Sequence, residues 1–390
     1  MATREVIRIG GLGPLSPPGI VQAGRELRDG MELAAQRVNE AGGVLGRPLQ
    51  LVFEDTMGTQ AAGVAAVNKL LREGVHALAG EFHSLVADAI VEPVQRAGLP
   101  FVCASATLDA ITTRRLGCVF RVAPPQSYGW RVYADFLAAE GFRHVVALQE
   151  ENVYWNRGAG VIEARLRDSG VRFTRVPVWS ATPSAPALVD QLERMMSRPP
   201  APDIVLLLIA YPEPLRSVVS ELRIRGLVPP ALFLGEPAGR TVFSDWWDAA
   251  GGDVTNVPFL AYARPQELAP EGHRLSERFE REHGREPTFV AFEGYDSVLA
   301  LARAIDAAQT TDPAQVCHLL RRVEVGGTRG TVAFSTEPKG VVHQQWRWPP
   351  VGVVAYQYPY QRFSAAVLLW EAERGGTGAS LRRDSQGRVP

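Results

Sequence analysis

The sequence has little of what marks disulfide-rich, membrane-spanning or nucleic-acid-binding proteins. Its 390 residues include three cysteines, too few for a disulfide framework. The formal net charge is −1, so no long-range attraction to nucleic acid or to an anionic membrane is expected. The longest apolar run, 204–210, is far shorter than the ~20 residues that span a bilayer. We therefore expect no nucleic-acid partner and no direct membrane insertion.

The three cysteines are most simply interpreted as free thiols in the core, because free cysteine behaves as a small apolar residue. Cys317 falls on a predicted helix. Cys103 and Cys118 could pair if the fold brought them together, and the sequence leaves that question open.

Motifs of catalysis and cofactor binding are also missing. The sequence has no GxxxxGK[ST] phosphate loop, no GxSxG nucleophile elbow and no zinc-type spacing of histidine and cysteine. Residues 10–19, GGLGPLSPPG, follow a strand, but Ser16 replaces the third glycine of a dinucleotide loop and Pro14 removes an amide. We predict a rigid loop over the mouth of a cleft there. We expect no metal, no cofactor and no enzymatic activity.

The first strand is predicted almost at the start of the sequence, without a hydrophobic leader before it. Two compartments stay open at this point. Either the protein works in the cytoplasm, or it works outside it and an export signal has been removed.

What the sequence does contain is a regular alternation of strands and helices. The helix predicted over 24–41 has one apolar face, ends at Gly42 and Gly43, and lies between strands over 6–12 and 49–54. Such β–α–β units build parallel sheets covered by helices. The alternation continues to strand 118–122, pauses at 122–125, and restarts. The fold class is therefore α/β with two lobes.

Three successive helices without strands between them, over 268–284, 288–309 and 313–323, cannot form a third α/β domain, so we expect them to return to the first lobe. The strands over 341–370 are expected on the second lobe. The predicted organisation is lobe 1 from 1–123 plus 258–338, lobe 2 from 124–257 plus 339–374, and a flexible tail over 375–390.

Polar residues follow two predicted strands of the first lobe. Ser84 comes after the strand that ends at Gly80, and Ser105 and Thr107 come after the strand over 100–104. Ligands bind beyond the carboxyl ends of parallel strands, and a helix N-terminus favours an anion. Ser84 is also a natural N-cap, a role compatible with binding a ligand carboxylate.

Aromatic and acidic residues follow strands of the second lobe. Tyr154 and Tyr211 come just after apolar strands, and Glu236 follows the strand over 231–235. A carboxylate there could neutralise a ligand ammonium, which is costly to bury alone. Each of the three has a simpler interpretation as a surface residue. Hydroxyls on one lobe with aromatics and an acid on the other fit a zwitterion.

Several segments resemble the leucine/isoleucine/valine-binding branch of the type I periplasmic-binding proteins, the receptors of ABC transporters. The resemblance spans roughly 5–345. The segments are VNEAGGVLGRPLQLVFED (38–55), AGEFHS (79–84), GLPFVCASAT (98–107), VFRVAPPQ (119–126), AYPEP (210–214) and FVAFEGYDSVLAL (289–301).

The resemblance implies two Rossmann-like lobes joined by three crossovers, which close by a hinge on an amino acid or related small carboxylate in the cleft between them. It implies that Ser84 and Thr107 hold the carboxylate, helped by the backbone of Ser105 and Ala106. By the same correspondence Tyr154 and Tyr211 line the opposite wall, and Glu236 takes the amino group.

The expected partners are the permease subunits of an ABC transporter, and the expected location is periplasmic or lipid-anchored outside the cytoplasm. The alternative is a cytoplasmic sensor of amides or amino acids on the same fold.

Overall fold

The computed structural model describes residues 6–178, 185–198, 201–210, 212–227, 234–235, 242–252, 254–264, 266–337, 342–347, 349–372 and 375–376. The chain divides into two compact units. Unit 1 consists of Met1–Gln126 and Tyr262–Pro350, and unit 2 of Ser127–Ala261 and Val351–Pro390. The chain therefore passes between the units at three places.

Unit 1 contains a parallel sheet of five strands in the order β2-β1-β3-β4-β5. Its strands are β1 (Ile7–Gly13), β2 (Leu49–Asp55), β3 (Ala77–Gly80), β4 (Phe101–Cys103) and β5 (Val119–Arg121). β3, β4 and β5 are buried along their whole length, as expected for parallel strands with helices on both faces.

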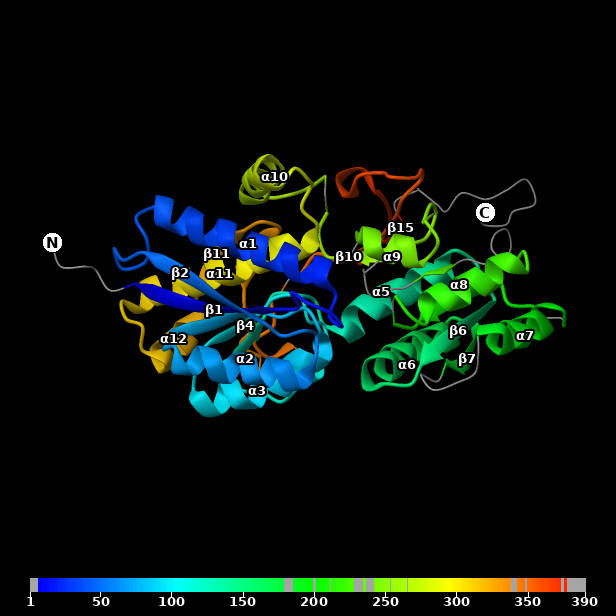
Figure 1. The fold of residues 1–390 in the computed structure, drawn as a ribbon, viewed down its shortest axis with the longest axis horizontal. Helices are drawn as coiled ribbons and strands as arrows, with labels where there is room; N and C mark the ends of the chain where they lie inside the picture. The colour runs from blue at the N-terminus through cyan, green and yellow to red at the C-terminus, as the bar shows by residue number, and fades with distance from the viewer. Residues whose placement is uncertain are drawn as a thin grey trace. The chain divides into compact units, whose positions relative to one another are not determined.

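Helices cover both faces of this sheet (Figure 1). The helices of unit 1 are α1 (Val21–Glu40), α2 (Gln60–Arg72), α3 (Ser84–Ala97), α4 (Ala110–Thr113), α10 (Pro270–His283), α11 (Phe289–Ala308) and α12 (Pro313–Leu320), of which α10 packs on α1 rather than on the sheet. α1 and α11 pack closely because glycines remove side chains at their contact. A Cβ on Gly30 would lie 2.2 Å from the Ala291 carbonyl oxygen, and one on Gly294 would lie 2.5 Å from that of Leu27.

A hairpin, β11 (Glu324–Gly327) with β12 (Gly330–Ala333), and residues 342–347 complete the described part of unit 1. The expectation that residues 342–347 belong to the second lobe is wrong. Gln345 bridges to Arg121 and Trp346 to Phe334. The Gln344 amide donates to the Val119 carbonyl at 2.7 Å, so polar side chains hold this segment on β5.

Unit 2 contains a second parallel sheet in the order β7-β6-β8-β9. Its strands are β6 (His144–Glu150), β7 (Arg172–Val178), β8 (Ile204–Leu208) and β9 (Leu234–Gly235). Its helices are α5 (Gln126–Ala139), α6 (Val153–Asp168), α7 (Ala185–Met196), α8 (Leu215–Ile224) and α9 (Ser244–Ala249). The predicted α/β class, with a parallel sheet in each of two lobes, is confirmed.

A smaller antiparallel sheet also belongs to unit 2, in the order β10-β13-β14-β15. Its strands are β10 (Phe259–Ala261), β13 (Gly352–Ala355), β14 (Val367–Glu371) and β15 (Gly375–Gly376), with a 3-10 turn at Phe363–Ala365. The part of the chain described here contains no helix long and apolar enough to cross a bilayer.

Candidate functional site

The candidate site of unit 1 lies where neighbouring parallel strands end. Gly13 pairs with Asp55 at the ends of β1 and β2, and Gly80 pairs with Cys103 at the ends of β3 and β4. The loops that follow these strands therefore leave the same edge of the sheet. This edge is where α/β proteins place their ligands.

The structure brings Ser84 and Thr107 together at this edge. Ser84 Oγ accepts hydrogen bonds from the backbone amides of Thr107, at 3.1 Å, and Leu108, at 3.2 Å. Both bonds use the oxygen as acceptor, so the hydroxyl hydrogen stays available to donate. The predicted N-cap role of Ser84 is wrong: α3 begins at Ser84, its N-cap is His83, and no side chain caps it. Instead of capping α3, the Ser84 hydroxyl oxygen accepts from two backbone amides of the loop over 104–109 and so orders that loop.

The loop over 104–109 is held from its other side by Arg121. This guanidinium is fully buried and donates to the carbonyls of Thr107, at 3.1 Å, and Leu108, at 2.7 Å. Its Nε donates to Gln345 at 2.6 Å. Because its carbonyls and amides are both fixed, the loop presents its remaining polar groups in one arrangement.

Three hydrogen-bond donors in and beside this loop have no acceptor among the described residues. The Thr107 hydroxyl and the Ala106 amide make no hydrogen bond to any residue that the structure describes, and the Ser84 hydroxyl hydrogen is the third. The Ser105 amide is used internally, since it donates to the Glu81 carbonyl at 3.1 Å. The Ser105 hydroxyl is buried without a well-formed hydrogen bond and lies beside the Glu293 carboxyl.

Glu81 is a feature of the site that sequence reasoning missed. It follows β3 with a left-handed backbone (φ 68°) and is fully buried. Its Oε1 accepts from the amides of Phe82, at 3.0 Å, and His83, at 2.7 Å, so the chain's own carboxylate occupies the two amides just before α3. The only sequence signal is an acidic residue directly after Gly80.

Burial raises the pKa of Glu81 to about 7, although the hydrogen bonds from the His83 and Phe82 amides and the nearby Thr56 hydroxyl oppose the shift. Desolvation therefore outweighs these bonds. A carboxyl that titrates near neutrality lies directly beside the expected ligand position.

The loop over 14–20 is anchored by two side chains. The Asp55 carboxylate accepts from the Leu15 amide at 2.7 Å, from the Met57 amide at 2.7 Å and from the Ser16 hydroxyl. His83 Nε2 accepts from the Ile20 amide at 3.1 Å. Partial burial works against ionisation of Asp55, but these hydrogen bonds lower its pKa overall.

A buried ion network lies behind Ser105. Arg329 lies 3.4 Å from a Glu293 oxygen and 3.2 Å from an Asp296 oxygen, and all three side chains are completely buried. Arg329 also donates to the Tyr262 carbonyl at 2.9 Å. Burial raises the pKa of Glu293 to about 7, with Arg329 acting in the opposite direction.

In unit 2, Tyr154 lies in the first turn of α6, just after β6 as predicted. Asn152 caps this helix through the Trp155 amide at 2.9 Å. The Tyr154 ring is half-buried and packs edge-on against Trp155, with centroids 5.0 Å apart, and Trp130, at 5.9 Å. Tyr211 and Glu236 lie outside the described residues.

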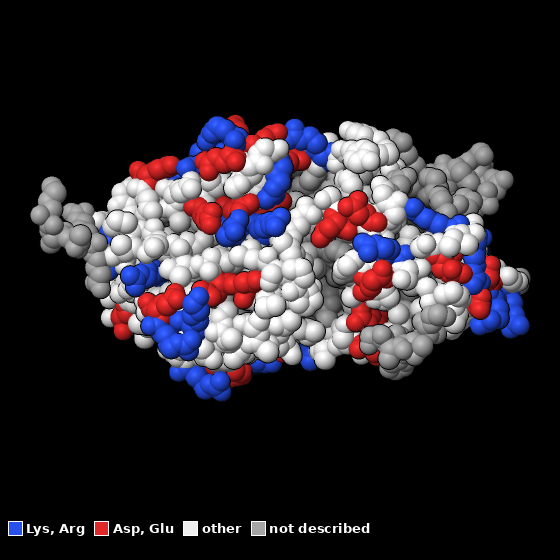
Figure 2. Space-filling model, viewed as in Figure 1, with Lys and Arg blue, Asp and Glu red and all other residues white. Residues whose placement is uncertain are grey.

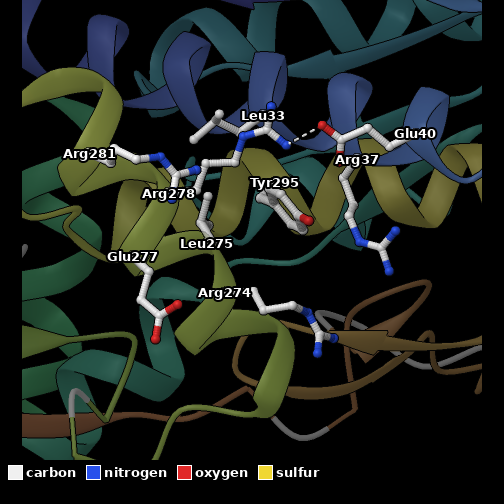
Figure 3. A pocket seen from close by; sticks show the side chains of 9 residues that line it. All are labelled: Leu33, Arg37, Glu40, Arg274, Leu275, Glu277, Arg278, Arg281 and Tyr295. Carbon is white, nitrogen blue, oxygen red and sulfur yellow. Dashed lines mark hydrogen bonds and ion pairs between the residues drawn. The ribbon is translucent and has the colours of Figure 1, made fainter.

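A hollow of about 270 Å³ lies between α1, α10 and α11 and is rich in arginine (Figure 3). Arg278 donates to Glu40 at 2.7 Å, and Arg37 and Arg274 both pair with Glu271. Charges of both signs alternate over this face of unit 1 (Figure 2). The arginines are therefore largely neutralised, and none of the predicted site residues lines this hollow.

The described residues contain no group of three or more histidine, cysteine, aspartate or glutamate side chains that could hold a metal ion. The arrangement at the edge of the unit 1 sheet is thus one of hydrogen-bond donors. Such an arrangement is suited to binding an oxygen-rich ligand.

Comparison with known proteins places this geometry in context. The family model described as periplasmic binding protein matches residues 6–348. The chain is 24% identical over 336 residues to the leucine-, isoleucine-, valine-, threonine- and alanine-binding protein of Pseudomonas aeruginosa, covering 85% of this chain and 86% of that one.

Solved structures share the fold. The leucine-binding protein LivK of Thermotoga maritima matches with a TM-score of 0.77 at 21% identity, over 93% of this chain and 97% of that one. A solute-binding protein of an ABC transporter from R. palustris, solved with benzoate, matches with a TM-score of 0.75 at 18% identity, over 96% and 98%.

Proposed function

The chain belongs to the periplasmic binding protein family, and from this premise we propose that it is the solute-binding receptor of an ABC importer. Its ligand is a small amino acid or a related carboxylate. Closure of the two lobes on this ligand, expected from the family resemblance, is part of the proposal.

The observation that carries the proposal is the set of three free donors beside α3. The Ser84 hydroxyl, the Thr107 hydroxyl and the Ala106 amide have no acceptor among the described residues, and a carboxylate offers only acceptors. Each charge-assisted hydrogen bond contributes about 1.5–3 kcal/mol. Two or three such bonds supply a good part of the ~8 kcal/mol that micromolar affinity requires.

The names of the relatives support a carboxylate more firmly than an amino acid. One relative is named for amino acids with apolar or small side chains, and another was solved with benzoate, which has no ammonium. The carboxylate is what these ligands share. The assignment of an amino acid rests on Glu236 as the partner of the ammonium, with Tyr154 and Tyr211 on the same wall.

The remaining parts of the proposal follow from the family. The protein binds its ligand without turning it over, and the permease subunits of an ABC transporter are its partners. It works outside the cytoplasm, in the periplasm or attached to the membrane by a lipid. The family and the relatives' names support this context.

Thermal shift and calorimetry test the proposal. A panel of leucine, isoleucine, valine, alanine, threonine and benzoate should contain at least one ligand that raises the melting temperature, because ligand stabilises the native state by mass action. Turnover of a bound compound by the purified protein would refute the role of a receptor without chemistry.

The ammonium partner is tested separately. Glu236→Gln should weaken an amino-acid ligand at least tenfold and leave its deaminated analogue unchanged, because only the amino acid presents an ammonium. Equal affinities of the variant and the wild type for the amino acid would remove the amino-acid assignment and leave the carboxylate assignment intact.

A further inference from the structure

Two of the three cysteines, far apart in the sequence, meet in unit 1. Cys118 lies just before β5 and Cys317 lies in α12. Each thiol is among the groups that shift the pKa of the other, and no disulfide joins them. The partner considered from the sequence, Cys103, is not at this contact. Its thiol is fully buried and faces the Ala106 carbonyl at 3.8 Å.

The backbones that carry the two thiols are tied together by Arg321. Its Nη1 donates to the Cys317 carbonyl at 3.1 Å, and its Nη2 donates to the carbonyl of Gly117, the residue before Cys118. The Cys118 amide donates to Gln95 at 3.1 Å. These hydrogen bonds hold the backbone around Cys118 close to the backbone of Cys317 in the folded unit 1.

The two thiols differ in reactivity. Cys118 is half-buried, whereas Cys317 is buried. The neighbouring Cys317 thiol lowers the pKa of Cys118, against the effect of burial and with help from the Arg321 charge. The same contact raises the pKa of Cys317. Cys118 is thus the thiol that ionises first, and the thiolate is the nucleophile in disulfide exchange.

We propose that Cys118 and Cys317 are a redox-active pair that closes to a disulfide by exchange with an external disulfide, with Cys118 as the attacking thiol and Cys317 as the resolving thiol. Cys118 Sγ loses its proton to solvent and attacks one sulfur of the oxidant, which releases one thiolate. Cys317 Sγ then loses its proton and attacks Cys118 Sγ, which releases the second. Two protein thiols are oxidised, and one disulfide is reduced to two thiols.

The bond would have a specific mechanical consequence. Unit 1 is assembled from two separate stretches of chain, and the cross-link joins one directly to the other. A disulfide across so long a loop restricts the unfolded chain strongly. The inference goes beyond ligand binding and does not depend on it.

The test uses the full-length protein, oxidised with glutathione disulfide or reduced with a phosphine. After oxidation, removal of glutathione and denaturation, we expect one free thiol of the three, a non-reduced peptide pair that contains Cys118 and Cys317, and no retained glutathione. The oxidised form should melt roughly 5–10 °C above the reduced form. Three free thiols after oxidation, or a cross-link through Cys103, would overturn the proposal.

Variants separate the two roles. Cys317→Ser should keep glutathione on Cys118, because no resolving thiol remains, and should raise the pH midpoint of Cys118 alkylation above that of the wild type. Cys103→Ser serves as the matched control and should form the cross-link like the wild type. If Cys317→Ser does not fold, the thiol count and peptide map of the wild type decide alone. An unmodified Cys118 in folded Cys317→Ser would also contradict the assigned order of attack.

Discussion

Replacing Ser84 by alanine would test the geometry of the site most informatively, because the hydroxyl has two separable roles. Its oxygen accepts from the amides of Thr107, at 3.1 Å, and Leu108, at 3.2 Å, and both of these residues are buried. Its hydrogen is proposed to donate to the ligand. Ser84→Ala removes both roles, whereas Thr107→Val removes only a hydroxyl without a described partner.

The structural role sets the expected loss of stability. Leaving a buried donor unsatisfied costs about 1–3 kcal/mol, and water entering the small space offsets part of that cost. For two amides we expect Ser84→Ala to lower the free energy of unfolding by about 2–4 kcal/mol. Thr107→Val should change it by less than about 1 kcal/mol, because no internal hydrogen bond is lost.

The proposed ligand role sets the expected loss of affinity. One charge-assisted hydrogen bond of about 1.5–3 kcal/mol corresponds to about a 10- to 150-fold weaker Kd. We expect this loss in both variants for a carboxylate ligand and a much smaller loss for its neutral amide. Urea unfolding and calorimetry measure the two effects independently.

The two outcomes contradict different parts of the reasoning. Unchanged stability of Ser84→Ala would mean that the hydroxyl does not order the loop over 104–109. A loss of stability in Ser84→Ala with unchanged discrimination between carboxylate and amide in both variants would leave Ser84 and Thr107 with no part in ligand binding.

Two further predictions concern buried charge. Arg329→Met leaves Glu293 and Asp296 without their buried partner and should lower the free energy of unfolding by about 3–5 kcal/mol in chemical denaturation. Arg274→Met removes an exposed arginine from its ion pair and should cost less than about 1 kcal/mol, and equal effects of the two substitutions would contradict the burial of the network. The pKa of Glu81 is raised from 4.5 to about 7, so between these pH values the folded protein holds a proton on Glu81 that the unfolded chain has lost. The free energy of unfolding should therefore fall by on the order of 3 kcal/mol as the pH rises from 4.5 to 7. Glu81→Gln should lose this component of the pH dependence, and an unchanged slope would refute it.

Much of the fold was predictable because strands and helices each have a characteristic local pattern of apolar and polar residues. The alternation of apolar strands and amphipathic helices indicated parallel sheets, and parallel strand ends meet at one edge. That is why Ser84 and Thr107, 23 residues apart, could be expected to come together, as their hydrogen bond shows.

Hydrogen bonds and contacts that depend on individual side chains could not be predicted from the pattern of apolar and polar residues. No periodicity indicates that the Glu81 carboxylate turns back onto the amides ahead of α3, or that Ser84 accepts from a loop rather than capping its helix. The segment 342–347 was misplaced because Gln344 looks like a surface residue and is instead completely buried against β5. The return of α12 to unit 1 was expected from the sequence, but no local pattern indicates that Cys118 lies beside Cys317 rather than beside Cys103.

The most direct measurement of the central claim is a calorimetric titration of the wild-type protein with a bound acid from the panel and with its primary amide. A carboxylate held by the Ser84 and Thr107 hydroxyls and the Ala106 amide predicts that the acid binds at least about tenfold more tightly than the amide. Equal affinity for the acid and the amide would contradict the account.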